Sequence, residues 1–370
     1  MKTIAILCGR YLPGFKDGGP VRTLINICEC LGDEYNFKII TNDRDHGDTK
    51  PYPNISYTQP NRVGKADVWY LPPKGFTFRK IKELTKDVDL IYCFGPYDDY
   101  AYKAMILKRF RKLKQPLVVA SMGSFSDGAI KIKNIKKKLF LNLCKIFGLF
   151  SNIVWSVTSD LEQNDVKKYI GKKADCCIAE DLPRNLPEIQ AKKPSNILRI
   201  IFLSRICEKK NLLYAIKVLQ KCSREVVFDI YGTLEDEDYW ETCKKEMALL
   251  PVHIHWQYKG VVDTHNVINV FSEYDVFLFP TRGENYGHVI FESMAGGCIP
   301  IISDQTPWLD LETKDCGFVF PLKDADRFSR IIEMLTEEKC IRKSKNARAY
   351  AKKKYIESVR DTGYRKVFDL

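Results

Sequence analysis

The 370-residue sequence contains no uninterrupted apolar run of the ~20 residues that would cross a bilayer, which excludes a membrane-spanning helix. Thirteen cysteines are present, but their odd number and the lack of any Cys-x-x-Cys spacing argue against a disulfide framework. Histidine is scarce, and His253 and His255 alternate without a carboxylate or thiolate cluster beside them, so no metal site is predicted. Arg10 interrupts the first apolar run too early for a secretory signal. We therefore expect a cytoplasmic protein that needs no metal.

Short apolar runs alternate with helical patterns along the chain, which is typical of βαβ units and parallel sheets. The sequence predicts strands at 3–7, 37–41, 90–93, 117–120, 153–157, 198–204, 226–231, 254–258, 276–279 and 299–303. It predicts helices at 21–31, 100–113 and 339–355. At roughly 150 residues per domain, this length favours two domains. We place them at 1–182 and 198–350, joined by a proline-punctuated linker at 183–197. Ligands of such sheets bind beyond the carboxyl ends of the strands.

Two glycines precede the first predicted helix. Gly18 and Gly19 follow the first strand and stand just before Pro20. Glycines let backbone N–H groups approach an anion at a helix N-terminus, so this turn is a candidate phosphate contact. The alternative is a flexible turn closed by Pro20. The pattern is not Gly-x-Gly-x-x-Gly, which argues against a dinucleotide-dependent dehydrogenase.

Basic residues follow the first strand of the second half. Arg205 and Lys210 flank a loop between that strand and an amphipathic helix. A guanidinium fork and an ammonium at such a place can grip a pyrophosphate. A solvated basic loop is the alternative.

A strand, a tight loop and a short helix follow one another between Phe279 and Ala295. The loop and the helix start hold Glu284, Asn285, Tyr286, Gly287, His288 and Val289, and Glu292 lies inside the helix. Loop amides and a helix N-terminus form an anion site, and the two carboxylates can accept hydrogen bonds from hydroxyls on either side of it. A nucleotide sugar presents its groups in that order. Glycoside hydrolysis is disfavoured because it needs carboxyls that face each other across one bond. The structural alternative is a capping Glu284 with a surface Glu292.

The segment Lys131–Phe150 is basic and amphipathic. It holds six lysines and no acid. Its apolar residues recur at helical spacing: Ile132, Ile135, Leu139, Leu143, Ile146 and Phe150. Such a helix can bind an anionic membrane, or its stripe can be the core face of a βαβ helix. We favour the membrane, at the inner face of the plasma membrane, because apolar residues continue at Phe147 and Leu149. Nucleic acid is disfavoured, because no recognised module is present.

These motifs, in this order, resemble the retaining GT-B glycosyltransferases of family 4 over nearly the whole chain. The resemblance rests on Gly18-Gly19, on Ser204-Arg205 with Lys210, and on Glu284 to Glu292. The run Ser303–Trp308 is similar to bacterial members. The resemblance implies an α/β GT-B fold with two Rossmann-like domains facing a cleft. It also implies that the C-terminal helix, at 351–370, crosses back to the first domain.

The resemblance also implies roles for these residues. Arg205 and Lys210 would hold the donor pyrophosphate, Glu284 with the amides of 285–288 would hold the transferred sugar, and Glu292 would hold the ribose. The implied activity is a metal-independent, retaining transfer from a nucleotide-diphosphate sugar to a glycan or lipid-linked acceptor, in cell-surface polysaccharide or glycoconjugate biosynthesis. No cofactor is implied besides the sugar donor.

Two positions depart from the family pattern. Many members carry a histidine after the strand that matches 117–120, where this chain has Met122 in a Ser-Met-Gly-Ser loop. Another frequent histidine corresponds to Phe94. We assign no catalytic role to Met122. Three alternatives remain: a nucleotide-sugar epimerase or a phosphorylase of the same fold, and a basic, non-catalytic protein that binds polyanions or membranes.

Overall fold

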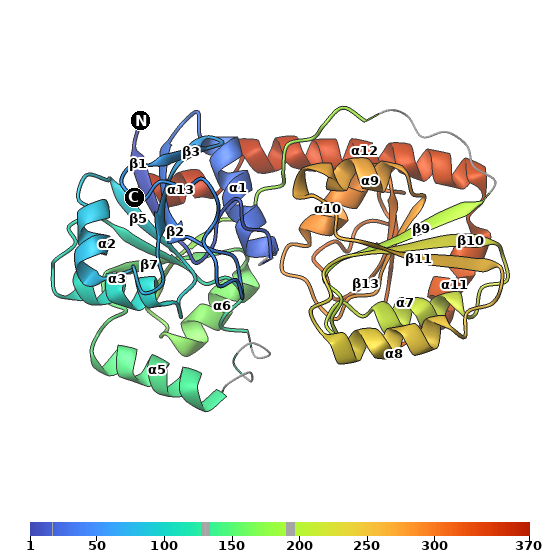
Figure 1. The fold of residues 1–370 in the computed structure, drawn as a ribbon, viewed down its shortest axis with the longest axis horizontal. Helices are drawn as coiled ribbons and strands as arrows, with labels where there is room; N and C mark the ends of the chain where they lie inside the picture. Colours follow the sequence, from blue (N-terminus) through green and yellow to red (C-terminus); the bar gives the residue numbers. More distant parts are fainter. Residues whose placement is uncertain (17, 127–129, 131–133, 190–196) are drawn as a thin grey trace. The chain divides into compact units, whose positions relative to one another are not determined.

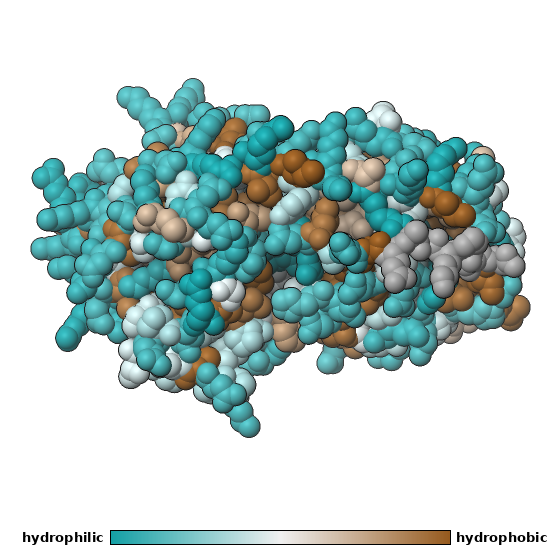
Figure 2. All heavy atoms as spheres, turned by 90° about the horizontal axis from the view of Figure 1, so that it is seen from above, coloured by the Kyte–Doolittle hydropathy of each residue, from teal (hydrophilic) through white to brown (hydrophobic). Residues whose placement is uncertain are grey.

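The computed structural model describes residues 1–16, 18–126, 130, 134–189 and 197–370. The chain divides into two compact units (Figure 1). Unit 1 comprises Met1–Asn185 and Glu357–Leu370, and unit 2 comprises Leu186–Ile356. Of the segments singled out from the sequence, 131–133 and 190–196 lie outside the described residues. Each unit has helices on both faces of a central sheet, and hydrophilic residues dominate the surface in Figure 2.

Unit 1 is built on an eight-stranded sheet of order β3-β4-β2-β1-β5-β6-β7-β8. Its neighbouring strands pair in parallel except for β3, which runs antiparallel to β4. The strands are β1 Thr3–Leu7, β2 Asn36–Asn42, β3 Asn61–Val63, β4 Ala66–Leu71, β5 Leu90–Phe94, β6 Leu117–Ala120, β7 Ile153–Val157 and β8 Asp175–Ile178. The helices are α1 Gly19–Leu31, α2 Phe78–Leu84, α3 Asp99–Arg109, α5 Asn134–Ile146, α6 Asp160–Tyr169 and α13 Tyr364–Phe368.

Both faces of this sheet are buried. Successive side chains of a strand point to opposite faces, so each strand contributes to two cores. In β1, Ile4 and Ile6 join the core beneath α1 and α13, whereas Ala5 and Leu7 join the core beneath α2, α3 and α5. This explains why the strand sequences are continuous apolar runs without polar alternation.

Unit 2 is built on a six-stranded sheet of order β11-β10-β9-β12-β13-β14, in which every pair is parallel. Its strands are β9 Leu198–Leu203, β10 Val226–Tyr231, β11 Ile254–Gly260, β12 Val276–Phe279, β13 Ile299–Ser303 and β14 Phe318–Phe320. Its helices are α7 Leu212–Leu219, α8 Glu237–Met247, the 3₁₀ helix η1 Thr264–Asn266, α9 Val267–Ser272, α10 His288–Ala295, α11 Ala325–Met334 and α12 Glu337–Arg360.

The C-terminal residues return to unit 1. Helix α12 is continuous from Glu337 to Arg360, so it crosses the boundary between the units at Glu357. Helix α13 then buries Tyr364, Val367 and Phe368 in the unit 1 core. The ring of Phe368 lies 5.4 Å from that of Tyr35, centroid to centroid. The prediction of a C-terminal helix that crosses back to the first domain is confirmed.

The predicted strands agree closely with the observed ones, and six of them have identical bounds: β1, β6, β7, β10, β12 and β13. The sequence analysis missed β3, β4, β8 and β14, which are short or carry polar residues such as Asp67 and Asp175. The predicted helix at 100–113 was too long. Helix α3 ends at Arg109 because Arg111 takes a left-handed conformation with φ of 55°.

Each sheet has one point where its strand order reverses direction. In unit 1 this point lies between β1 and β5, and in unit 2 it lies between β9 and β12. Crevices at the carboxyl ends of such strands are where open α/β sheets bind ligands.

Candidate functional site

Hydrogen bonds join the loops after β9 and β12 at the switch point of unit 2, which is the point where the strand order reverses. The backbone N–H of Arg282 donates to the Lys209 carbonyl at 2.9 Å. Asn211 stands at the N-cap of α7 in a left-handed conformation, and its amide donates to the Pro280 carbonyl at 2.8 Å. These bonds fix the positions of the side chains that both loops carry. The sequence analysis missed Asn211, although an asparagine just before a helix is a recognisable capping signal.

Lys210 and Glu284 form an ion pair across these loops. The Lys210 Nζ lies 2.6 Å from Glu284 Oε1, and the Thr281 hydroxyl donates to the same oxygen at 3.0 Å. Both side chains are largely shielded, with exposed fractions of 12% and 11%. A shielded pair of this kind is screened by salt much less than a surface pair. The structure therefore brings together two residues that the sequence placed 74 positions apart.

Arg205 lies at the same carboxyl edge but has another partner. Its guanidinium contacts Glu235 at 2.7 Å, and both side chains are exposed. Glu235 lies in the loop after β10, the strand next to β9 in the sheet. Exposed pairs contribute little to stability, so the Arg205 side chain can change partner at low cost.

Helix α10 begins at the end of the same loop. Its N-cap is Gly287 with φ of 78°, and a Cβ there would come within 3.0 Å of Ile290. The preceding Tyr286 carbonyl accepts a hydrogen bond from the Trp308 indole at 2.6 Å. No side-chain hydrogen bond caps the N-terminus of α10, and the backbone N–H groups of Ile290 and Phe291 donate to the Gly287 carbonyl.

The alternative of a capping Glu284 with a surface Glu292 is wrong. The N-cap of α10 is Gly287, and Glu284 forms its ion pair with Lys210. Glu292 lies one turn inside α10 with an exposed fraction of only 1%. Asn285, by contrast, is exposed. A buried carboxylate is costly unless it is paired or hydrogen-bonded.

Gly18 and Gly19 belong to unit 1, at the start of α1. Gly18 is the N-cap with φ of 63°, a conformation that favours glycine. A Cβ built on either glycine would meet no atom within 4 Å. The local backbone is therefore accessible at the helix N-terminus.

Unit 1 has a cavity of about 340 Å³ at its own switch point. Gly9 and Arg10 line it after β1, and Asp98 lines it after β5. Both positions where family histidines are missing, Phe94 and Met122, also line this cavity. The structure therefore brings Phe94 and Met122 to one cavity.

The sequence analysis overlooked the polar groups of the unit 1 cavity: Arg10, His46, Tyr97 and Asp98. The Tyr100 hydroxyl donates to the Asp98 carboxylate at 2.9 Å. Arg10, His46 and Asp98 all follow the carboxyl ends of neighbouring strands, and this position was the available signal.

Tyr97 joins this cavity to α5. Burial raises the pKa of Tyr97 to about 12, so its hydroxyl keeps its proton at physiological pH. The ring packs against Phe140 of α5 at 5.7 Å between centroids, and the Lys137 ammonium lies 5.1 Å from the ring centroid.

The sequence predicts neither a metal site nor a membrane-spanning helix. Among the described residues, no group of three or more histidine, cysteine, aspartate or glutamate side chains could hold a metal ion. Within the same ranges, no helix combines the length and the apolar character that crossing a membrane requires. All thirteen cysteines are free thiols, and burial raises the pKa of several, including Cys8 to about 12.

Residues 187–354 match the family model described as Glycosyl transferases group 1. The chain is 23% identical over 296 residues to an uncharacterized 41.2 kDa protein in the cps region of Klebsiella pneumoniae. The aligned residues cover 76% of this chain and 78% of that protein. Among solved structures it is similar to sucrose-phosphate synthase from Thermosynechococcus elongatus, with a TM-score of 0.71 and 15% identity. It is also similar to HepE from Anabaena in complex with UDP and glucose, with a TM-score of 0.72 and 16% identity. Both alignments cover 100% of each chain. The predicted GT-B fold class is confirmed.

Proposed function

We propose that this chain, in which residues 187–354 form a group 1 glycosyltransferase domain, transfers a sugar from a nucleotide-diphosphate sugar to a glycan or lipid-linked acceptor. The observation that carries the proposal is the shielded Lys210–Glu284 pair beside the N-terminus of α10, at the switch point of the group 1 domain. Cationic, anionic and amide groups meet there within one loop cluster, and a nucleotide sugar requires all three.

The donor site follows from the order of these groups. Arg205, Lys210 and the first-turn amides of α10 meet the pyrophosphate charge. Glu284 accepts hydrogen bonds from hydroxyls of the transferred sugar, and Glu292 accepts them from the ribose. Because Lys210 and Glu284 touch in the structure, the pyrophosphate and sugar subsites adjoin each other. The similar HepE structure holds UDP and glucose, which makes a UDP-hexose the first donor to test.

The acceptor site is the unit 1 cavity. It lies at the carboxyl ends of β1 and β5 and holds Asp98, His46 and Arg10, which can orient a hydroxyl nucleophile. The similarity to a protein of a cps region supports an acceptor in cell-surface polysaccharide biosynthesis.

The reaction we propose retains the anomeric configuration and uses no metal ion. The acceptor hydroxyl attacks on the face that the diphosphate leaves, and the departing diphosphate takes the proton. No protein nucleophile is required. The protein stabilises the charge that develops on the diphosphate through Arg205, Lys210 and the α10 amides, which act in a preorganised site.

We also propose that unit 1 works at an anionic membrane surface. Helix α5 packs its Leu141 and Cys144 into the core. Of the stripe predicted from the sequence, Leu139, Leu143 and Ile146 are exposed, whereas Phe150 packs against the core. Leu139, Leu143, Ile146 and Phe147, here termed the α5 apolar face, are all exposed. Lys136, Lys138 and Lys145 are exposed on the same helix. Apolar and basic groups exposed together fit the interface of an anionic bilayer.

A thermal-shift panel of UDP-, GDP- and ADP-sugars tests the function. A ligand at a hundred times its Kd stabilises by about 2.7 kcal/mol, so the true donor should raise Tm measurably. Product formation should then require an acceptor, and nuclear magnetic resonance should find the anomeric configuration unchanged. Products formed without an acceptor would indicate an epimerase, and dependence on free phosphate would indicate a phosphorylase. If no nucleotide sugar shifts Tm, the proposal is wrong.

A further inference from the structure

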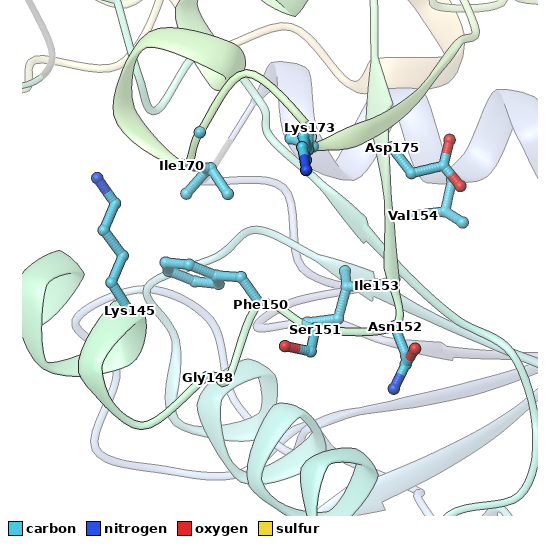
Figure 3. A pocket seen from close by; sticks show the side chains of 12 residues that line it. Lys145, Gly148, Phe150, Ser151, Asn152, Ile153, Val154, Ile170, Lys173 and Asp175 are labelled. Carbon is cyan, nitrogen blue, oxygen red and sulfur yellow. The ribbon is translucent and has the colours of Figure 1, made fainter.

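Unit 1 contains a second, larger cavity of about 640 Å³ on the edge opposite the acceptor cavity (Figure 3). It is lined by Ile153 and Val154, the first residues of β7, and by Asp175, the first residue of β8. It therefore lies at the amino ends of the strands, whereas substrates of open α/β sheets bind at the carboxyl ends. Its position excludes it from the transfer reaction.

Two lysines from separate elements reach this cavity. Lys145 comes from the last turn of α5, and Lys173 comes from the turn between α6 and β8. In Figure 3 the Lys145 ammonium stands at one side of the cavity, and the Lys173 ammonium points toward the viewer. Neither lysine forms an ion pair with the described residues. The lining carboxylate, Asp175, lies beside Val154, on the far side of the cavity from Lys145.

The rest of the lining combines apolar and polar surface. Phe150 and Ile170 supply aromatic and aliphatic walls, and Ser151 and Asn152 supply polar groups at the other side. Gly171 lines the turn with φ of 145°, and a Cβ there would meet no atom within 4 Å. A group with a charged head and an apolar extension fits this mixture of side chains.

The cavity is continuous in sequence with the α5 apolar face. Ile146 and Phe147 stand between the two lining residues Lys145 and Gly148, and their exposed fractions are 77% and 62%. The Arg109 guanidinium donates to the Phe147 carbonyl at 3.3 Å and so holds this corner against α3. Acyl chains in contact with Ile146 and Phe147 would bring a lipid headgroup to Lys145.

We propose that this cavity binds the phosphate-bearing headgroup of an anionic membrane lipid, with its charge between Lys145 and Lys173 and its acyl chains against Ile146 and Phe147. The inference rests on the membrane part of the proposed function and deepens it, because an exposed lysine is attracted to any anionic surface whereas a cavity selects one headgroup. The bound lipid would hold unit 1 in a fixed orientation on the bilayer.

Calorimetric titration with short-chain dihexanoyl phosphatidylglycerol, kept below its micelle concentration, tests this site. Wild-type protein should bind it saturably with a stoichiometry of one. K145Q/K173Q should weaken binding by about 10- to 30-fold, because the headgroup phosphate loses both of its cationic partners. S151W, which fills the cavity without a change of charge, should abolish binding. The matched control K50Q/K82Q removes two exposed lysines outside the cavity and should bind as wild type does.

Two further arms identify the ligand. Dihexanoyl phosphatidylcholine should bind at least tenfold more weakly, and inorganic phosphate should also bind more weakly, because it lacks the apolar extension. Equal binding of either probe would overturn the proposal, as would an unaffected K145Q/K173Q variant. The same variants are titrated with the nucleotide sugar. Donor binding without lipid binding refutes only this inference, whereas lipid binding without donor binding refutes only the proposed transferase function.

Discussion

At the scale of single residues, the proposed function assigns Lys210 to the pyrophosphate and its ion-pair partner Glu284 to the transferred sugar. Its two partners should respond differently to substitution. K210A removes a charged hydrogen-bond donor to the pyrophosphate and should weaken nucleotide-diphosphate binding roughly tenfold to hundredfold. E284A should leave that affinity unchanged or slightly tighter, because Lys210 loses its 2.6 Å partner.

Transfer by E284A should nevertheless collapse, since the sugar loses a contact that helps to hold it as charge develops at the anomeric carbon. Calorimetric titration with the nucleotide diphosphate, beside a transfer assay, measures both effects. Loss of nucleotide binding in E284A would contradict the placement of the sugar at Glu284.

Glu292 should act on the nucleotide instead. Its carboxylate is buried inside α10, so E292Q preserves its shape and removes its charge. We expect E292Q to weaken both the free nucleotide diphosphate and the donor by roughly tenfold, because the ribose hydroxyls lose a charged acceptor. Circular dichroism provides the control for folding. If affinity is unchanged while Tm falls, Glu292 is a structural residue and does not bind the ribose.

Asp98 provides the corresponding test in unit 1. Because it lines the unit 1 cavity, D98N should lower transfer while the affinity for the donor stays at the wild-type value. The KM for the acceptor and the Kd for the nucleotide sugar are the two measurements. If the KM for the acceptor and the Kd for the nucleotide sugar rise equally, Asp98 belongs to the donor site.

Asp181 should make the stability of the protein depend on pH. Burial raises the pKa of this carboxyl group to about 7, so it is protonated in the folded chain below that pH. The unfolded carboxyl ionises near pH ~4. Unfolding therefore releases a proton between these values, and the free energy of unfolding falls as pH rises from about 4 to about 7, then levels off.

D181N has no proton to release and should lack this dependence. The difference in Tm between D181N and wild type should grow in favour of the variant from pH 5 to pH 7 and stay constant above it. D67N, at an exposed strand position, serves as the control. A difference that does not change with pH would show that Asp181 is ionised in the folded protein.

At the scale of elements, one side of helix α5 packs into the core of unit 1 and the other side is exposed. One side packs Leu141 and Cys144 into the unit 1 core, and Phe140 packs against Tyr97, which lines the 340 Å³ cavity of unit 1. The other side carries the α5 apolar face with its lysines. A membrane contact on α5 would thus be linked to the proposed acceptor cavity through the contact between Phe140 and Tyr97. This arrangement suits an acceptor held in or at the membrane.

Sedimentation with anionic vesicles at low salt tests this helix. K136Q/K138Q should lower the partition onto vesicles by about 25-fold, at about 1 kcal/mol per lysine, and L139S/F147S should lower it at any salt concentration. Lys137 is left in place because it lies over the Tyr97 ring. K50Q/K82Q should sediment as wild type does. Unchanged sedimentation of both α5 variants would leave acceptors in solution as the better hypothesis.

At the scale of the whole molecule, the proposed function assigns the donor to the switch point of unit 2 and the acceptor to that of unit 1. If Arg205, Lys210 and backbone amides of unit 2 meet the charge of the diphosphate, turnover should survive EDTA. R205A should be folded but about 10²–10³ slower, as is typical when one stabilising donor is removed. Initial rates with EDTA and with added Mg²⁺ or Mn²⁺ are the measurements. Activity that is lost in EDTA and restored by a metal would refute the metal-independent mechanism.

The sequence by itself determined the strands, because the buried strands of parallel sheets are continuous apolar runs such as 198–203 and 276–279. It also singled out Arg205, Lys210 and Glu284 as candidates, because loops after parallel strands meet at one sheet edge, and Glu292 in the helix that follows; their roles stay predictions. Short edge strands such as β14 escaped detection, because pairing with neighbours stabilises them more than their own pattern does.

Only the tertiary structure decided which of these groups touch. The Lys210–Glu284 pair, the burial of Glu292 and the raised pKa of Asp181 depend on packing between segments far apart in the sequence. The outward direction of the α5 apolar face was equally undecided, since an apolar stripe has the same spacing whether it meets a core or a membrane. Its sequence neighbours Leu141 and Cys144 filled the core instead, which left Leu139, Leu143 and Ile146 at the surface.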